Sequence, residues 1–173
     1  MCTMVYMNYI SQEQENIVKC DSRHKMIIGC AGSRKTDTLV KTIKHLFDDN
    51  PKNTLVLTKV SSVTDELRKR LERDMEMTFN SNSSKKHFSC KVGEKYINIC
   101  NYDAWVHEML VKHDIEFTGD DFKGKTKQLL DLTLKGKTTC FMKNGEVAEE
   151  LVVDEVQDLF SYQMQILCNL ASY

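Results

Sequence analysis

Two acidic residues, Asp154 and Glu155, directly follow a short apolar run at residues 151–153. Such a run is typical of a buried strand, and ligands of open α/β sheets bind at the carboxyl ends of the strands. One carboxylate there would hold Mg²⁺ through water, while the other would position or deprotonate an attacking water. The alternative is a solvated strand end, which often carries acidic residues. The pair therefore indicates catalysis only if a phosphate site accompanies it.

A phosphate site is predicted at residues 29–36, whose sequence is GCAGSRKT. The segment departs from the pattern G-x-x-x-x-G-K-[ST] because Arg34 stands where the second glycine belongs. An apolar run at residues 25–29 precedes it and an amphipathic stretch at residues 36–47 follows it, so the loop would open a helix whose N-terminus faces the anion. The alternative is a plain turn of small residues. The predicted nucleotide-binding residues are Gly29, Cys30, Ala31, Gly32, Ser33, Arg34, Lys35 and Thr36.

Two side chains of this loop would act on the nucleotide directly. Lys35 would reach the β- and γ-phosphates, and the Thr36 hydroxyl would bind Mg²⁺, so the implied cofactors are ATP and Mg²⁺. Arg34 brings a side chain to a position where glycine lets the backbone approach the phosphates closely. We therefore expect nucleotide binding to survive and turnover to be altered.

A literal match to the phosphate-loop pattern occurs elsewhere, at residues 119–126 (GDDFKGKT). Asp120 and Asp121 would face the phosphates with like charge, and no convincing buried strand precedes the segment. We predict that this match is a coincidence in a connector rich in lysine and glycine.

The order of these segments resembles the superfamily 1 helicases of the UvrD/Rep type. Residues 154–158 (DEVQD) match motif II of that family, D-E-x-Q-D, and residues 29–36 resemble motif I. Residues 10–14 (ISQEQ) resemble the Q motif. Thr58 with residues 61–68 resembles motif Ia, and residues 101–103 (NYD) resemble motif Ib. The resemblance extends from about residue 8 to the end of the sequence.

The resemblance assigns roles that spacing alone does not. It implies that Gln14 reads adenine and that Gln157 senses the γ-phosphate, which places Gln157 with Lys35 and Glu155 among the catalytic residues. It also implies that the segments at Thr58 and Tyr102 line a path for single-stranded DNA. Tyr102 would stack on a base, although a half-buried tyrosine is equally consistent with the spacing. Lys59 stands where the family usually has an aromatic residue and would contact a phosphate instead.

The alternation of apolar runs and amphipathic stretches predicts an α/β fold. Strands are expected at residues 25–29, 54–58 and 151–153, and a hairpin at residues 87–92 and 96–100. Helices are expected at residues 36–47, 104–112, 128–134 and 159–170, with another capped by Ser61 or Ser62. The resemblance makes this a RecA-like P-loop domain with a mostly parallel sheet. We expect the apolar residues of the last helix to pack beneath strands beyond residue 173.

Composition excludes several classes of protein. The chain has 173 residues, 41% of them hydrophobic, and a net charge of −1, which is unlike a histone-type basic protein. No apolar run approaches the length that a membrane span requires, and no secretory signal is evident. The seven cysteines are irregularly spaced and show no zinc-binding pattern. We expect reduced thiols and a cytoplasmic or nuclear location. Divergent helicases of this type occur in large DNA viruses, an origin with which the resemblance is compatible.

The resemblance implies one partial motor domain, called 1A, at residues 1–173, with residues 80–100 and 113–148 as insertions. Motifs III to VI and the second motor domain are absent from this sequence, so we expect ATP binding but no unwinding without a partner. Two other functions remain open: a non-catalytic remnant that binds nucleic acid or protein, and a small, unrelated P-loop ATPase or kinase.

Overall fold

The computed structural model describes residues 11–20, 34–81, 86–116 and 122–171. The chain divides into two compact units, residues 1–50 and residues 51–173, and each is described by itself. The strand expected at residues 25–29 and the loop residues Gly29, Cys30, Ala31, Gly32 and Ser33 lie outside the described residues.

The first unit contains helices α1 (Gln12–Val18) and α2 (Lys35–Asp49), which contact each other. Helix α1 begins with a capping box, in which the Ser11 hydroxyl accepts a hydrogen bond from the Gln14 N–H and the Gln14 side chain accepts one from the Ser11 N–H. Helix α2 confirms the amphipathic stretch predicted at residues 36–47. Its buried residues include Val40, Ile43 and Phe47, at the spacing of one helical face.

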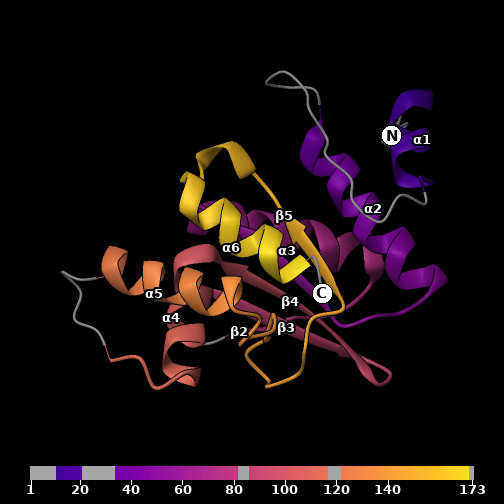
Figure 1. The fold of residues 1–173 in the computed structure, drawn as a ribbon. Helices are drawn as coiled ribbons and strands as arrows, with labels where there is room; N and C mark the ends of the chain where they lie inside the picture. The colour runs from indigo at the N-terminus through magenta and orange to yellow at the C-terminus, as the bar shows by residue number, and fades with distance from the viewer. Residues whose placement is uncertain (1–10, 21–33, 82–85, 117–121, 172–173) are drawn as a thin grey trace, which may run out of the picture. The chain divides into compact units, whose positions relative to one another are not determined.

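The second unit is built on a five-stranded sheet in the order β2-β3-β4-β1-β5 (Figure 1). The strands are β1 (Thr54–Thr58), β2 (Asn80–Ser81), β3 (His87–Val92), β4 (Lys95–Asn101) and β5 (Glu150–Val153). Strand β1 pairs in parallel with both β4 and β5, whereas the β2–β3 and β3–β4 pairs are antiparallel. The sheet is therefore mixed, and the expected mostly parallel sheet is wrong.

The hairpin is the physical reason for the mixed sheet. Strands β3 and β4 are joined at Gly93, whose φ of 61° suits a tight turn, and a tight turn can connect only antiparallel strands. The hairpin itself was predicted and is confirmed. Its strand β4 then pairs with β1, so the hairpin extends the central sheet.

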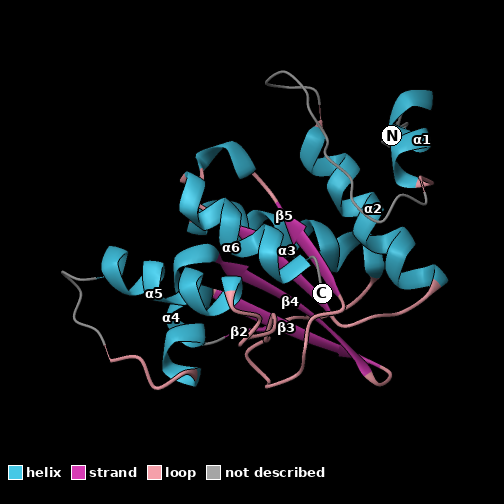
Figure 2. Cartoon of the chain, viewed as in Figure 1, coloured by secondary structure: helices cyan, strands magenta, loops and turns pink. Residues whose placement is uncertain are grey.

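Helices cover both faces of the sheet (Figure 2). Strand β1 is buried along its whole length, as expected for a central strand between two layers. Helices α4 (Tyr102–Lys112), α5 (Phe122–Leu134) and α6 (Ser161–Ala171) share one core with Leu55 and Leu57. Helix α3 (Ser61–Met75) contacts β1 and β4, and its Arg68 guanidinium lies 5.1 Å from the Phe88 ring centroid.

The last helix packs differently from our expectation. Its residues Ile166, Leu167 and Leu170 are buried in the core shared by α4 and α5, and Leu159 packs against the same core. The Asn169 side-chain amide also donates a hydrogen bond to the Thr133 hydroxyl of α5 at 3.1 Å. These apolar residues are therefore covered by neighbouring helices, and the prediction that they need further strands is wrong.

Two local expectations also fail. Neither Ser61 nor Ser62 caps α3, because the helix begins at Ser61 and Val60 occupies the N-cap position without a side-chain cap. The Thr64 hydroxyl instead donates to the Val60 carbonyl oxygen at 3.2 Å. Helix α5 is longer than predicted, since it begins at Phe122 and not near residue 128.

Residues 122–126 of the literal phosphate-loop match belong to helix α5. The residues corresponding to G-K-T lie within α5, after its first residue Phe122, and not in a loop ahead of a helix. The Thr126 side chain is fully buried, and its hydroxyl donates to the Phe122 carbonyl oxygen at 2.8 Å. This threonine has a structural role, in agreement with the rejection of the match.

Three of the described cysteines, Cys90, Cys100 and Cys140, are buried thiols without a disulfide partner. Burial raises the pKa of each of these thiols, that of Cys140 to about 12, so they are poor nucleophiles. None of the helices in the described part of the chain has the length and apolar character required to cross a lipid bilayer.

Candidate nucleotide and nucleic-acid site

The three parallel strands of the second unit end at one edge of the sheet. Thr58 of β1 is paired with Asn101 of β4, and Leu57 is paired with Val153 of β5. Lys59, Tyr102 and Asp154 follow these strands directly, so the structure brings the predicted nucleic-acid residues and the predicted acid pair to the same edge. Carboxyl ends of parallel strands are where α/β sheets bind ligands.

Asp154 is held firmly at the end of β5. Its N–H donates to the Leu57 carbonyl oxygen at 2.9 Å, which continues the parallel ladder one residue beyond the strand. Its carboxylate Oδ1 accepts a hydrogen bond from the Glu155 N–H at 3.0 Å, and the residue is only 7% exposed. A fixed carboxylate at a strand end is a suitable oxygen ligand for Mg²⁺.

Glu155 adopts a left-handed backbone conformation, with φ 52° and ψ 45°. This conformation costs a non-glycine residue about 1–2 kcal/mol, so the surrounding structure must hold it there. The residue opens a short 3₁₀ helix, Val156–Asp158, which turns the chain back. The Gln157 side-chain amide donates a hydrogen bond to Glu155 Oε2, so the predicted base and the predicted γ-phosphate sensor contact each other.

Lys59 forms an ion pair that the sequence did not reveal. Its ammonium lies 2.9 Å and 3.1 Å from the two carboxylate oxygens of Asp103, and 5.6 Å from the Tyr102 ring centroid. The Asn101 side-chain amide donates to the Lys59 carbonyl oxygen at 2.7 Å, and its Oδ1 accepts from the Asp103 N–H, which caps α4. An Asn directly before a helical pattern is the signal that could have identified this cap.

Removing the Asp103 charge should release Lys59. We expect Asp103→Asn to raise the affinity for single-stranded DNA about three- to tenfold, because a phosphate would no longer compete with the carboxylate for the ammonium. Fluorescence anisotropy with a labelled oligonucleotide at low salt measures the change. Asp131→Asn removes one charge from the exposed face of α5 and is the matched control. An equal gain in both variants would show that only net charge matters.

Unlike Lys59, the residues Thr58 and Tyr102 are almost completely buried. The Thr58 residue is 1% exposed, and its hydroxyl lies 2.5 Å from the Thr64 hydroxyl, so the side chain links β1 to α3. Tyr102 is also 1% exposed, with its ring 5.7 Å from that of Trp105. Burial raises the pKa of Tyr102, and the negative charge of Asp103 raises it further. The ring offers no exposed face to a base in this structure, and it is more deeply buried than the half-buried tyrosine that was the alternative.

In the first unit, the structure describes the last three residues of the predicted phosphate loop. Arg34 is the N-cap of α2, and Lys35 and Thr36 form the start of its first turn. The first hydrogen bond of the helix is donated by the Thr38 N–H to the Arg34 carbonyl oxygen at 3.0 Å. The N–H groups ahead of Thr38 therefore have the orientation by which helix N-termini bind anions.

Arg34 occupies the left-handed region, with φ 58° and ψ 35°. Glycine adopts this conformation without the steric cost that a Cβ atom brings, so the backbone has the geometry that a glycine at this position would favour. We expect Arg34→Gly to raise the free energy of unfolding by up to about 1 kcal/mol, the relief of strain being partly offset by unfolded-state entropy. Urea denaturation measures the change. Arg34→Ala keeps the Cβ atom and should give no gain; an equal gain would contradict the explanation.

Gln14, the predicted adenine reader, is the third residue of α1 and part of its capping box. Its Oε1 accepts the hydrogen bond of the Ser11 N–H at 2.9 Å. The cap fixes the position of the side chain and uses one of its acceptor sites.

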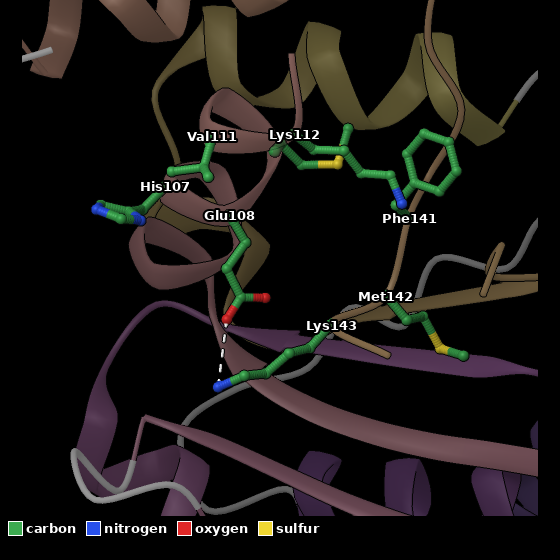
Figure 3. A pocket seen from close by; sticks show the side chains of 8 residues that line it. His107, Glu108, Val111, Lys112, Phe141, Met142 and Lys143 are labelled. Atoms are coloured by element: carbon green, nitrogen blue, oxygen red, sulfur yellow. Dashed lines mark ion pairs between the residues drawn. The ribbon is translucent and has the colours of Figure 1, made fainter. Parts of the chain in front are cut away.

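A cavity of about 410 Å³ lies in the second unit between α4 and the segment at residues 141–143 (Figure 3). Glu108 points toward Lys143 across it, with 3.6 Å between carboxylate and ammonium, and Lys112 lies over the Phe141 ring. The cavity is lined by the second half of α4, whereas the strand-end residues adjoin the first turn of that helix. It is therefore separate from the predicted site.

Among the described residues, no group of three or more His, Cys, Asp or Glu side chains is arranged to hold a metal ion. Mg²⁺ in nucleotide sites is usually bound by one or two protein oxygens, with phosphates and waters completing the shell. The Asp154 carboxylate is an oxygen donor of that kind, so the end of β5 fits Mg²⁺.

The second unit is an α/β domain with a mixed sheet, and the candidate ligand site lies at the carboxyl ends of its parallel strands. Residues 10–119 match the family described as the UvrD/REP helicase N-terminal domain. The match covers more than half of the chain, so the chain belongs to this helicase family, as the motif order predicted. Motif II, at residues 154–158, lies outside the matched range. No curated protein and no solved structure matches the chain.

Proposed function

We propose that the chain is the ATP-binding N-terminal motor domain of a UvrD/Rep-like DNA helicase. The observation that carries the proposal is the acid pair after β5, with Asp154 nearly buried and fixed by two backbone hydrogen bonds. The family match at residues 10–119 supports the helicase class. In this proposal residues 1–173 form a partial motor domain 1A, with residues 80–100 and 113–148 as insertions.

The nucleotide is bound by the loop at residues 29–36. Its backbone N–H groups bind the phosphates, Lys35 neutralises the β- and γ-phosphate charge, and Thr36 and Asp154 supply oxygen ligands for Mg²⁺. The bound ion would neutralise charge on the phosphate oxygens. Gln14 recognises the adenine.

Hydrolysis depends on the Glu155 carboxylate, which orients the attacking water and accepts its proton. The hydrogen bond from Gln157 holds this carboxylate in place, and Gln157 also senses the γ-phosphate. We propose that ATP turnover drives movement along single-stranded DNA only together with a second motor domain or a partner chain. The strand-end segments at Thr58, Lys59 and Tyr102 face the DNA path, where Lys59 exchanges Asp103 for a phosphate. The buried thiols support a reducing compartment, the cytoplasm or the nucleus.

A second candidate is a non-catalytic module that binds nucleic acid or a protein partner. The observation that favours it is Arg34, a non-glycine residue with left-handed backbone angles at a glycine position of the predicted phosphate loop. An unrelated P-loop ATPase or kinase is disfavoured by the family match.

Titration with a fluorescent ATP analogue, with and without oligodeoxythymidylate, separates the two candidates. We expect Mg²⁺-dependent nucleotide binding that Lys35→Ala weakens at least 100-fold. Lys44→Ala removes a charge from the same helix, at a side chain that is 44% exposed, and should bind normally. Binding of the oligonucleotide without any nucleotide binding would favour the non-catalytic module and contradict the proposal.

A further inference from the structure

Two aromatic side chains after motif II, the exposed Phe160 and the half-buried Tyr162, form a stacked pair. The rings of Phe160 and Tyr162 are nearly parallel, with an interplanar angle of 7° and 5.7 Å between their centroids. Phe160 is 62% exposed, although apolar side chains of this size are usually buried. An exposed, flat aromatic surface is therefore present directly after the 3₁₀ helix at Val156–Asp158.

The local backbone fixes this surface. The Phe160 N–H donates to Oε1 of Gln163 at 2.9 Å, and the Gln163 and Met164 N–H groups donate to the Phe160 carbonyl oxygen at 2.9 Å and 3.0 Å. Gln163 is itself only 3% exposed. The ring of Phe160 therefore projects from an ordered helix start, which reduces the entropy lost when a ligand binds to it.

The pair follows the carboxyl end of β5 closely in the chain. Asp154 directly follows that strand, the 3₁₀ helix Val156–Asp158 comes next, and Phe160 and Tyr162 flank Ser161, the first residue of α6. The pKa of Tyr162 is raised by burial and by the charge of the Asp103 carboxylate, which is paired with the Lys59 ammonium at 2.9 Å. Asp158 and Glu155 precede the pair in the chain.

We propose that Phe160 and Tyr162 form a stacking platform for the bases of single-stranded nucleic acid. Each base has an apolar face that stacks on aromatic rings, and such stacking needs no sequence preference. The platform takes the role that the sequence predicted for Tyr102, whose ring is buried. The inference rests on the proposed function for the identity of the ligand, but it does not depend on ATP binding. Because stacking on an aromatic ring neutralises no phosphate charge, the stacking contribution should change little with salt concentration.

The test uses the whole chain and oligodeoxythymidylate containing one 2-aminopurine, whose fluorescence falls on stacking. We expect Phe160→Ala to weaken binding about tenfold and to abolish the fluorescence change. Phe160→Trp should restore both. Leu134→Ala is the matched control, because Leu134 is also 62% exposed but lies on α5. Mg-ATP affinity, measured on the same samples, should be equal in all four proteins.

Each other outcome is informative. Normal oligonucleotide binding by Phe160→Ala would overturn the platform and leave the proposed function intact. The same conclusion would follow if the unmodified chain bound Mg-ATP but did not bind the oligonucleotide. Loss of Mg-ATP binding in the unmodified chain would contradict the proposed function alone. A change in self-association of Phe160→Ala, without a change in 2-aminopurine fluorescence, would show that the pair is a protein contact and overturn the inference.

Discussion

Replacing Trp105 by alanine is expected to lower the free energy of unfolding by about 3–5 kcal/mol. The side chain is 1% exposed at the centre of the core of the second unit. Its indole N–H donates to the Phe141 carbonyl oxygen at 3.0 Å, which ties α4 to the segment before β5. Alanine would leave a cavity and an unpaired carbonyl oxygen. Because small domains are stable by only about 5–15 kcal/mol, this is a large part of the total.

Urea denaturation followed by circular dichroism measures the effect, since Trp105 is the chain's single tryptophan and its fluorescence is lost in the variant. Trp105→Phe fills most of the space and should cost about 1–2 kcal/mol, mainly through the lost hydrogen bond. Val111→Ala, on the same helix at 57% exposure, should cost less than about 0.5 kcal/mol. A loss below about 1 kcal/mol for Trp105→Ala would contradict the described core.

Glu155→Gln is expected to lower ATP turnover by about 10²–10⁴-fold. Glutamine has the same size and can adopt the same backbone conformation, but it cannot accept a proton from water. ATP affinity should remain within about threefold, because Glu155 is proposed to act on water and not on the phosphates. Single-turnover phosphate release, in the presence of oligodeoxythymidylate, measures the rate.

Asp158→Asn is the matched control, since Asp158 belongs to the same turn and is exposed. Its turnover should stay close to that of the unmodified chain. If Glu155→Gln kept more than a tenth of the original rate, Glu155 would not be the base.

Local patterns of the sequence were sufficient for most helices and strands. Strand β1 and the hairpin of β3 and β4 appear where apolar runs and the turn at Gly93 predicted them. The motif order also identified the helicase family. These features depend on residues close in the chain, where side-chain periodicity and turn chemistry decide the structure.

Features that depend on distant residues were not predictable. The pairing of β4 with β1 made the sheet mixed, and the hairpin sequence contains no information on which strand it joins. Lys59 and Asp103 are 44 positions apart, so their ion pair became visible only in the structure. The burial of Tyr102 likewise depends on α4 packing against the sheet, whereas its place before a helix suggested a half-exposed ring.

The magnesium dependence of ATP affinity tests the central claim most directly, because it depends on motif II acting as a nucleotide site. ATP titrations with Mg²⁺ and with a chelator should show at least tenfold tighter binding with Mg²⁺ for the unmodified chain and for Asp158→Asn. For Asp154→Asn the difference should fall to about twofold, since one of the oxygen ligands of the ion loses its charge. Full magnesium dependence in Asp154→Asn, or no ATP binding by the unmodified chain, would contradict the account.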